Sequence, residues 1–180
     1  MTTVNEVGVT VNQSVGEHLV AGSTLKLVLA DVTRGDIDVG VMGRFGPVRA
    51  AIVMKHLAEP DVTSGEDPEQ LQRQVRVGLA YVPLPRDGRA INLSMDADLT
   101  TTVTALGNER HIAAGAEWWV RRRLGVRGGF TANTVDDVRP SFSAGVSAAA
   151  RPSLFLEAAA TRGTAAAARN GWGVGARVTF

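Results

Sequence analysis

The sequence has no cysteine, few aromatic residues and no long hydrophobic run. The lack of cysteine excludes a disulfide framework, a thiol nucleophile and a thiolate metal site. The lack of a run of about 20 apolar residues excludes a transmembrane helix. The formal net charge is only +1, so the chain lacks the basic surface that nucleic-acid binding requires. We therefore expect no nucleic-acid partner.

What the sequence does contain is strict alternation, which is clearest in residues 171–180. Successive strand side chains point to opposite faces, so this segment has one apolar face and one small or polar face. A strand of about ten residues with aromatic residues at both rims fits a tilted transmembrane β-strand. The pattern also resembles the carboxy-terminal signal by which bacterial outer-membrane barrels are recognised for insertion. The residues expected to face lipid and to form this assembly signal are Trp172, Val174, Val178 and Phe180.

The same alternation recurs along the chain, in about eleven segments with no helical period between them. This predicts an all-β fold, an antiparallel up-and-down meander that forms one transmembrane β-barrel domain over residues 1–180. Connections alternate between short turns and longer loops, as in outer-membrane barrels. The predicted short turns are 14–17, 44–47, 121–123 and 151–153, and the long loops are 57–71, 100–109, 133–140 and 162–170. A further loop is predicted at 31–35, and the connection 82–89 is longer than its side predicts.

Polar residues occupy the opposite face of the predicted strands. Those expected to line the lumen are Arg76, Asn92, Asp96, Asp98, Glu117, Arg127 and Arg177. A turn centred near residue 122 places Glu117 opposite Arg127, which predicts an ion pair between them. Asp96 and Asp98 share a strand face, as the two carboxylates of an acid–base site would. Pairing of these carboxylates with Arg76 on the preceding strand is the favoured interpretation.

No catalytic constellation is visible, and we expect no enzymatic activity, no metal and no cofactor. His18, His56 and His111 are scattered along the chain. The glycines at 125, 128 and 129 are not followed by a helix, so packing of a narrow lumen is favoured over a phosphate loop. The arginines at 121–123 have two interpretations, a site for anionic lipid or an ordinary solvated turn. The solvated turn is favoured.

Several segments carry a resemblance to a known family. They are residues 55–60 (KHLAEP), 73–81 (RQVRVGLAY), 114–119 (AGAEWW) and the closing strand. With them the chain resembles the FadL-related outer-membrane barrels, nearest the PorV/PorQ-type proteins, over most of its length from Leu25. The resemblance implies a barrel of about fourteen strands. It also implies a role within a range that runs from the uptake of hydrophobic solutes to service as a subunit of secretion or surface-attachment machinery. The amino-terminal hatch of the solute transporters has no counterpart in this sequence.

Two functions of different classes are therefore expected. One is a channel or transporter for small hydrophobic solutes. The other is a structural or docking barrel that serves a partner protein of a secretion or surface-attachment machinery. Both place the protein in the bacterial outer membrane, with outer-membrane lipid and the barrel-assembly machinery as partners.

The start of the chain bears on the size of the barrel. Met1 is followed by neither a charged n-region nor an apolar h-region, so the sequence has no secretory signal. Bacterial single-chain barrels have an even number of strands, and an open sheet would leave unpaired edges in lipid. We therefore expect about three further strands and a signal peptide to precede Met1 in a longer native barrel.

Overall fold

The structure, a computed structural model, describes residues 4–64, 68–104, 107–121, 123–164 and 170–178. Within these ranges no segment is helical, which confirms the predicted all-β class. The strands are β1 (Asn5–Val15), β2 (Leu19–Leu29), β3 (Thr33–Phe45), β4 (Val48–Lys55), β5 (Gln74–Tyr81), β6 (Arg89–Asp98), β7 (Thr102–Thr104), β8 (Gly107–Glu109), β9 (His111–Val120), β10 (Leu124–Asn133), β11 (Ser141–Arg151), β12 (Leu154–Gly163) and β13 (Gly171–Val178).

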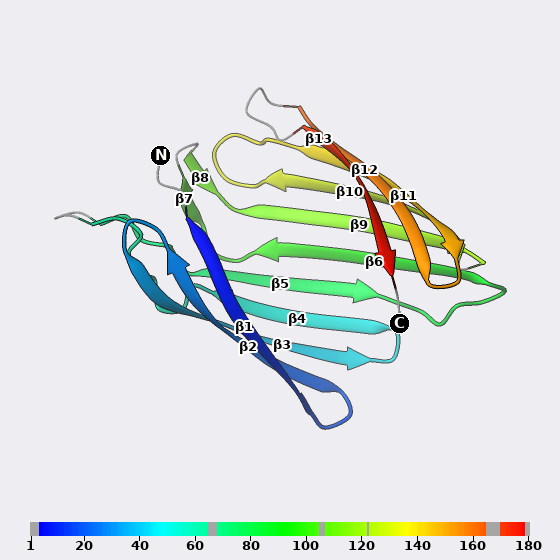
Figure 1. Ribbon diagram of the computed structural model, residues 1–180, viewed down its shortest axis with the longest axis horizontal. Helices are drawn as coiled ribbons and strands as arrows, with labels where there is room; N and C mark the ends of the chain where they lie inside the picture. The colour runs from blue at the N-terminus through cyan, green and yellow to red at the C-terminus, as the bar shows by residue number, and fades with distance from the viewer. Residues whose placement is uncertain (1–3, 65–67, 105–106, 122, 165–169, 179–180) are drawn as a thin grey trace.

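One eleven-stranded sheet contains every strand except β7 and β8, which form a small hairpin of their own. Its strands follow chain order and pair antiparallel with their neighbours, so the predicted meander is confirmed. Figure 1 shows the sheet curling into an open trough with β1 and β13 at its two edges. Across the described residues these edge strands do not pair with each other, so the sheet is not closed into a barrel.

The register gives this sheet one apolar face and one polar face, because directly opposed residues of paired strands share a face. Leu25 lies opposite Ile37, for example, and Ile91 lies opposite Trp118. The apolar face is formed by Val7, Val9, Val11, Leu25, Leu27, Ile37, Val39, Val41, Ile52, Met54, Val75, Val77, Leu79, Tyr81, Ile91, Leu93, Met95, Ile112, Trp118, Val126, Phe130, Phe142, Val146, Leu156, Trp172, Val174 and Val178. The polar face is formed by Glu6, Thr10, Asn12, Lys26, Asp36, Asp38, Arg44, Arg49, Arg76, Asn92, Asp96, Asp98, Glu117, Arg127, Ser143, Ser147, Glu157 and Arg177.

Burial on the two faces is the reverse of that in a water-soluble sheet, which packs its apolar face on a core. On the apolar face Val9 is 70% and Leu25 63% exposed, whereas Lys26 and Asp36 on the polar face are 8% and 2% exposed. Side chains converge on the inner side of a curved sheet and diverge on its outer side. The polar face therefore lines the inside of the trough, and the apolar face covers its outside.

Short and long connections lie at opposite ends of the sheet. The short-connection end joins strands through residues 16–18, 46–47, 82–88, 121–123 and 152–153. The long-connection end joins them through residues 30–32, 56–73, 99–110, 134–140 and 164–170. The structure thus confirms the predicted sorting, with two exceptions. Residues 30–32 are short on the long side, and residues 82–88 are long on the short side.

Several predicted connections differ from the structure in their bounds. The turn predicted at 14–17 lies at 16–18, because Ser14 pairs with Val20 and Val15 with Leu19. The loop predicted at 31–35 is wrong in its bounds, because Leu29 pairs with Thr33 and only residues 30–32 remain between the strands. The loop predicted at 100–109 contains β7 and β8, in which Thr102 pairs with Glu109 and Thr104 with Gly107.

Candidate functional site

The residues predicted to line a lumen all lie on the polar face. Asn92 is opposite Glu117, and Glu117 is opposite Arg127, so these three form one row across β6, β9 and β10. Arg76 on β5 is opposite Asp98 on β6. The alternation in the sequence therefore predicted which side chains share a surface.

The residues predicted to face lipid lie on the other side of the sheet. Trp172, Val174 and Val178 belong to the apolar face of β13 and are 81%, 76% and 52% exposed. Phe180 lies outside the described residues.

The pairing proposed for the β6 carboxylates is confirmed. The Arg76 Nε donates to Asp98 Oδ1 at 2.6 Å and lies 3.7 Å from Asp96 Oδ1. The other Asp98 oxygen accepts the backbone N–H of His111 at 3.0 Å. Asp98 is thereby fixed between an arginine on one neighbouring strand and the first residue of the other. This geometry fits a structural carboxylate held in its charged form.

The predicted ion pair between Glu117 and Arg127 is wrong, although their opposition across the hairpin is correct. Glu117 instead accepts from Asn92 Nδ2 at 3.1 Å. The Arg127 guanidinium reaches over β11 to Glu157 Oε2 on β12, at 3.7 Å. Gly145 on β11 makes this route possible, because a Cβ there would lie 2.6 Å from Arg127 Nε.

The carboxylate of Glu157 contacts polar side chains from the neighbouring strands near the end of the chain. In addition to Arg127, it accepts from Arg177 Nε at 3.1 Å and from the hydroxyl of Ser147 at 3.5 Å. Arg177 also lies over the ring of Phe155, 4.8 Å from its centre. The inner side of the trough brings these groups from β10, β11, β12 and β13 into contact.

A second charged cluster, which the sequence did not predict, is buried at the long-connection end. The Lys26 Nζ lies 3.0 Å from Asp38 Oδ1, 3.1 Å from Asp36 Oδ2 and 3.4 Å from Glu6 Oε2. The ring nitrogen Nδ1 of His56 lies 2.7 Å from the same Asp36 oxygen. The backbone N–H of His56 donates to Asp38 Oδ1 at 3.0 Å. The cluster therefore joins β1, β2 and β3 to the start of the connection 56–73.

Three members of this cluster have the chemistry of metal ligands. Asp36, Asp38 and His56 offer ligand atoms within 4.8 Å of one another, the only such group in the described part of the chain. The Lys26 ammonium already lies against all three, so the chain supplies its own cation at this position. A metal ion would have to displace that ammonium.

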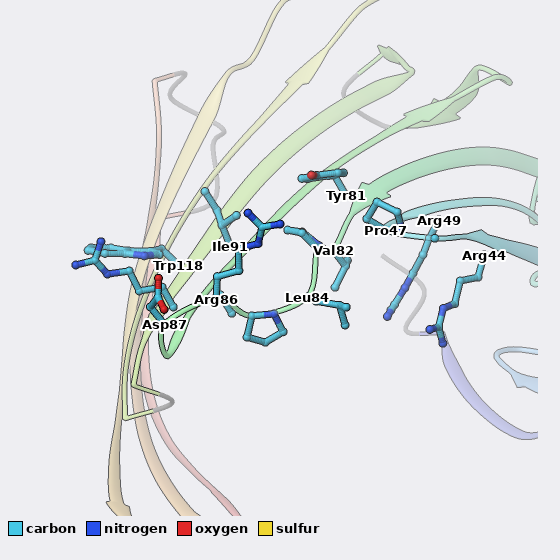
Figure 2. A pocket seen from close by; sticks show the side chains of 15 residues that line it. Arg44, Pro47, Arg49, Tyr81, Val82, Leu84, Arg86, Asp87, Ile91 and Trp118 are labelled. Atoms are coloured by element: carbon cyan, nitrogen blue, oxygen red, sulfur yellow. The ribbon is translucent and has the colours of Figure 1, made fainter.

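A large cavity lies at the short-connection end, between the β3–β4 turn and the connection 82–88. Its volume is about 1030 Å³, and Arg44, Arg49, Arg86 and Arg89 line it together with Asp87. Figure 2 shows Arg44 and Arg49 extending alongside each other, and Arg86 and Asp87 across the cavity on the loop. Apolar residues form the rest of the lining, and the larger of their side chains are those of Tyr81, Val82, Leu84, Ile91 and Trp118.

Local sequence explains how the arginines are placed. Arg44 and Arg49 flank the Gly46–Pro47 turn and are directly opposite each other on β3 and β4. Asp87 and Gly88 have φ of 50° and 71°, the positive values of a type I′ turn, for which Asp-Gly is a preferred pair. Arg86 and Arg89 consequently exchange both backbone hydrogen bonds, at 2.9 and 2.8 Å. Each pair of arginines is thus held together by a tight turn.

This cavity was visible in the sequence only as an anomaly. The connection 82–89 is one of the two exceptions to the sorting of loop lengths, and it supplies much of the lining. The spacing of Arg44 and Arg49, and of Arg86 and Arg89, around glycine-containing turns was the signal that could have identified the site.

Comparison of the chain with protein-family models, curated proteins and solved structures found no significant match. No helix in the described ranges is long and apolar enough to cross a membrane.

Proposed function

We propose that this protein forms the wall of a non-enzymatic β-barrel in the bacterial outer membrane. The observation that supports this most strongly is the continuous apolar face on the outside of the trough. Eleven strands keep the alternation in register, and large side chains such as Val9, Leu25 and Val174 stay more than half exposed. In water such a surface would be a severe aggregation hazard. In a bilayer it contacts acyl chains.

The dimensions of the sheet support the same environment. Its strands have between 8 and 13 residues, and a tilted transmembrane strand needs about 9–11. Short turns at one end and longer connections at the other match the periplasmic and outer sides of such barrels. In lipid, the edges of β1 and β13 need strand partners, because unpaired backbone groups cost several kcal/mol each.

For the role of this barrel, we propose a channel or transporter for small solutes, hydrophobic ones in view of the resemblance to the FadL-related proteins. Assembly then requires the barrel-assembly machinery, and the closing strand is the segment that this machinery would recognise. The polar face becomes the lumen wall, and its glycines leave room along it.

A second role, as a structural or docking barrel for a secretion or surface-attachment partner, is favoured by the charges on the polar face. Arg127 bridges β10 to β12, and Lys26 binds carboxylates from β1 and β3. Such bridges stiffen the wall, and apolar solutes gain nothing from contact with them.

Reconstitution of the chain in vesicles tests the barrel proposal, and bilayer conductance separates the two roles. We expect heat-modifiable migration on a gel and protection of the strands from protease. Stepwise conductance supports the channel, whereas a barrel that inserts but shows no conductance supports the docking role. A chain that stays monomeric and soluble without detergent, and does not bind to vesicles, would contradict both proposed roles.

A further inference from the structure

The cavity at the short-connection end holds arginines that form no ion pair with any residue the structure describes. No ion pair forms at Arg44, Arg49, Arg86 or Arg89 anywhere in the described ranges. Asp87 is the one acidic residue in the cavity lining. The lining therefore carries a surplus of positive charge.

The arrangement of these arginines is unfavourable in the absence of a ligand. Arg44 is directly opposite Arg49, and like charges in directly opposed strand positions repel. Arg86 is likewise paired with Arg89 across its turn. Two repelling pairs around one cavity become favourable when an anion lies between them, because guanidinium groups bind phosphate oxygens through paired N–H donors.

The positive charge continues along the same end of the sheet. Arg121 donates its backbone N–H to the carbonyl of Gly88, which ties the β9–β10 turn to the loop of the cavity. Arg121, Arg123 and Arg151 line a second cavity of about 370 Å³ at the neighbouring turns. We call these three and the four arginines of the larger cavity the arginine rim.

The rest of the cavity lining is mostly apolar and lies on the other side of the sheet from Arg44 and Arg49, so the cavity runs round the short-connection end of the sheet. Tyr81, Ile91 and Trp118 belong to the apolar face, where Ile91 and Trp118 are directly opposite. Leu84 on the loop is 87% exposed. Tyrosine and tryptophan are typical of the level of lipid headgroups. A free anion would contact the arginines alone, whereas an amphiphile would contact both parts of the lining.

We propose that this cavity binds an anionic phospholipid of the membrane leaflet at the short-connection end. Its phosphate lies between the two arginine pairs, and its acyl chains lie along Tyr81, Ile91 and Trp118. The inference rests on the proposed membrane location, because only there are the apolar face and the rim in contact with lipid. The remaining arginines of the rim hold further headgroups beside it.

Binding of short-chain lipids to the micelle-solubilised protein tests the proposal, with native mass spectrometry as the readout. The probes are dioctanoyl phosphatidylglycerol, dioctanoyl phosphatidylcholine and glycerol phosphate, which is the free headgroup. We expect phosphatidylglycerol to bind tightest. Each arginine near an anionic lipid contributes about 1 kcal/mol, or about fivefold. Arg44→Gln with Arg49→Gln should then weaken phosphatidylglycerol binding about 25-fold, and Arg86→Gln with Arg89→Gln should do the same.

The matched control is Arg34→Gln with Arg162→Gln, which removes the same charge at the long-connection end and should leave the affinity unchanged. Equal binding of glycerol phosphate and phosphatidylglycerol would overturn the lipid assignment in favour of a free anion. Equal binding of phosphatidylcholine, or an equal loss in the control, would show that the arginines do not form a site. Insertion into pure phosphatidylcholine vesicles is measured separately. Its failure in the unmodified protein counts against the membrane location, and normal insertion without lipid preference counts against this site alone.

Discussion

The two ends of the sheet differ in whether their charged side chains form ion pairs. At the long-connection end, carboxylates are held by cations at short range, as in Lys26 with Asp36 and Arg76 with Asp98. At the short-connection end, Arg44 is opposite Arg49 and Arg86 is opposite Arg89, and none of the four forms an ion pair within the described residues. Charged side chains at the long-connection end pair with one another and stabilise the fold. Charged side chains at the short-connection end are available to bind a ligand.

This contrast has a physical cause in burial. The Lys26 and Asp36 side chains are 7% and 0% exposed, and a charge so far from water must have a partner. Arg44 and Arg49 are exposed, so water can solvate them when no ligand is present. The same residue type can therefore be a structural requirement at one end and a binding group at the other.

The largest effect that separates the two ends is expected for Lys26→Met. This change leaves Asp36 buried without its ammonium partner and should lower the free energy of unfolding by about 3–5 kcal/mol. Arg44→Met, at an exposed and unpaired position, should change it by less than about 0.5 kcal/mol. Urea unfolding of the micelle-bound protein measures both. Equal losses would contradict the distinction between the ends.

A smaller effect is expected for Asp98→Asn. The change weakens the charge-assisted hydrogen bond from Arg76 and should lower the free energy of unfolding by about 1.5–3 kcal/mol. Its control is Asp87→Asn, since asparagine tolerates the positive φ of that position and the carboxylate forms no ion pair within the described residues. We expect almost no change for the control. A larger loss at Asp87 than at Asp98 would reverse the assignment.

The smallest change in stability is expected from salt. At about 1 M ionic strength the screening length falls to about 3 Å, which affects exposed charges far more than buried ones. The free energy of unfolding should change by less than about 1 kcal/mol, while the preference for phosphatidylglycerol should be lost. Titration of both quantities with sodium chloride checks this. Retention of the lipid preference at high salt would show that the arginine rim does not act through charge.

The alternation of apolar and polar residues predicted the two faces of the sheet. It did not predict the contacts that depend on strand register or on the curvature of the sheet. A loop at 31–35 would have paired residue 30 with residue 36 and placed Lys26 opposite Gly40. The true turn at 30–32 places it opposite Asp36, and the buried cluster follows. The partner of Arg127 was missed because it lies across Gly145 on another strand. Pairwise opposition across one hairpin cannot show such a contact.

The central claim is that, between the two ends of the sheet, the apolar face contacts lipid and the polar face does not. Leu93 and Ser94 lie side by side in the middle of β6, on the apolar and the polar face respectively. The direct test compares Leu93→Arg with Ser94→Arg by the free energy of insertion into phosphatidylcholine vesicles. Arginine at Leu93 should cost about 2–4 kcal/mol, as at the bilayer midplane, and arginine at Ser94 should cost almost nothing. Equal costs, or a larger cost at Ser94, would contradict the account.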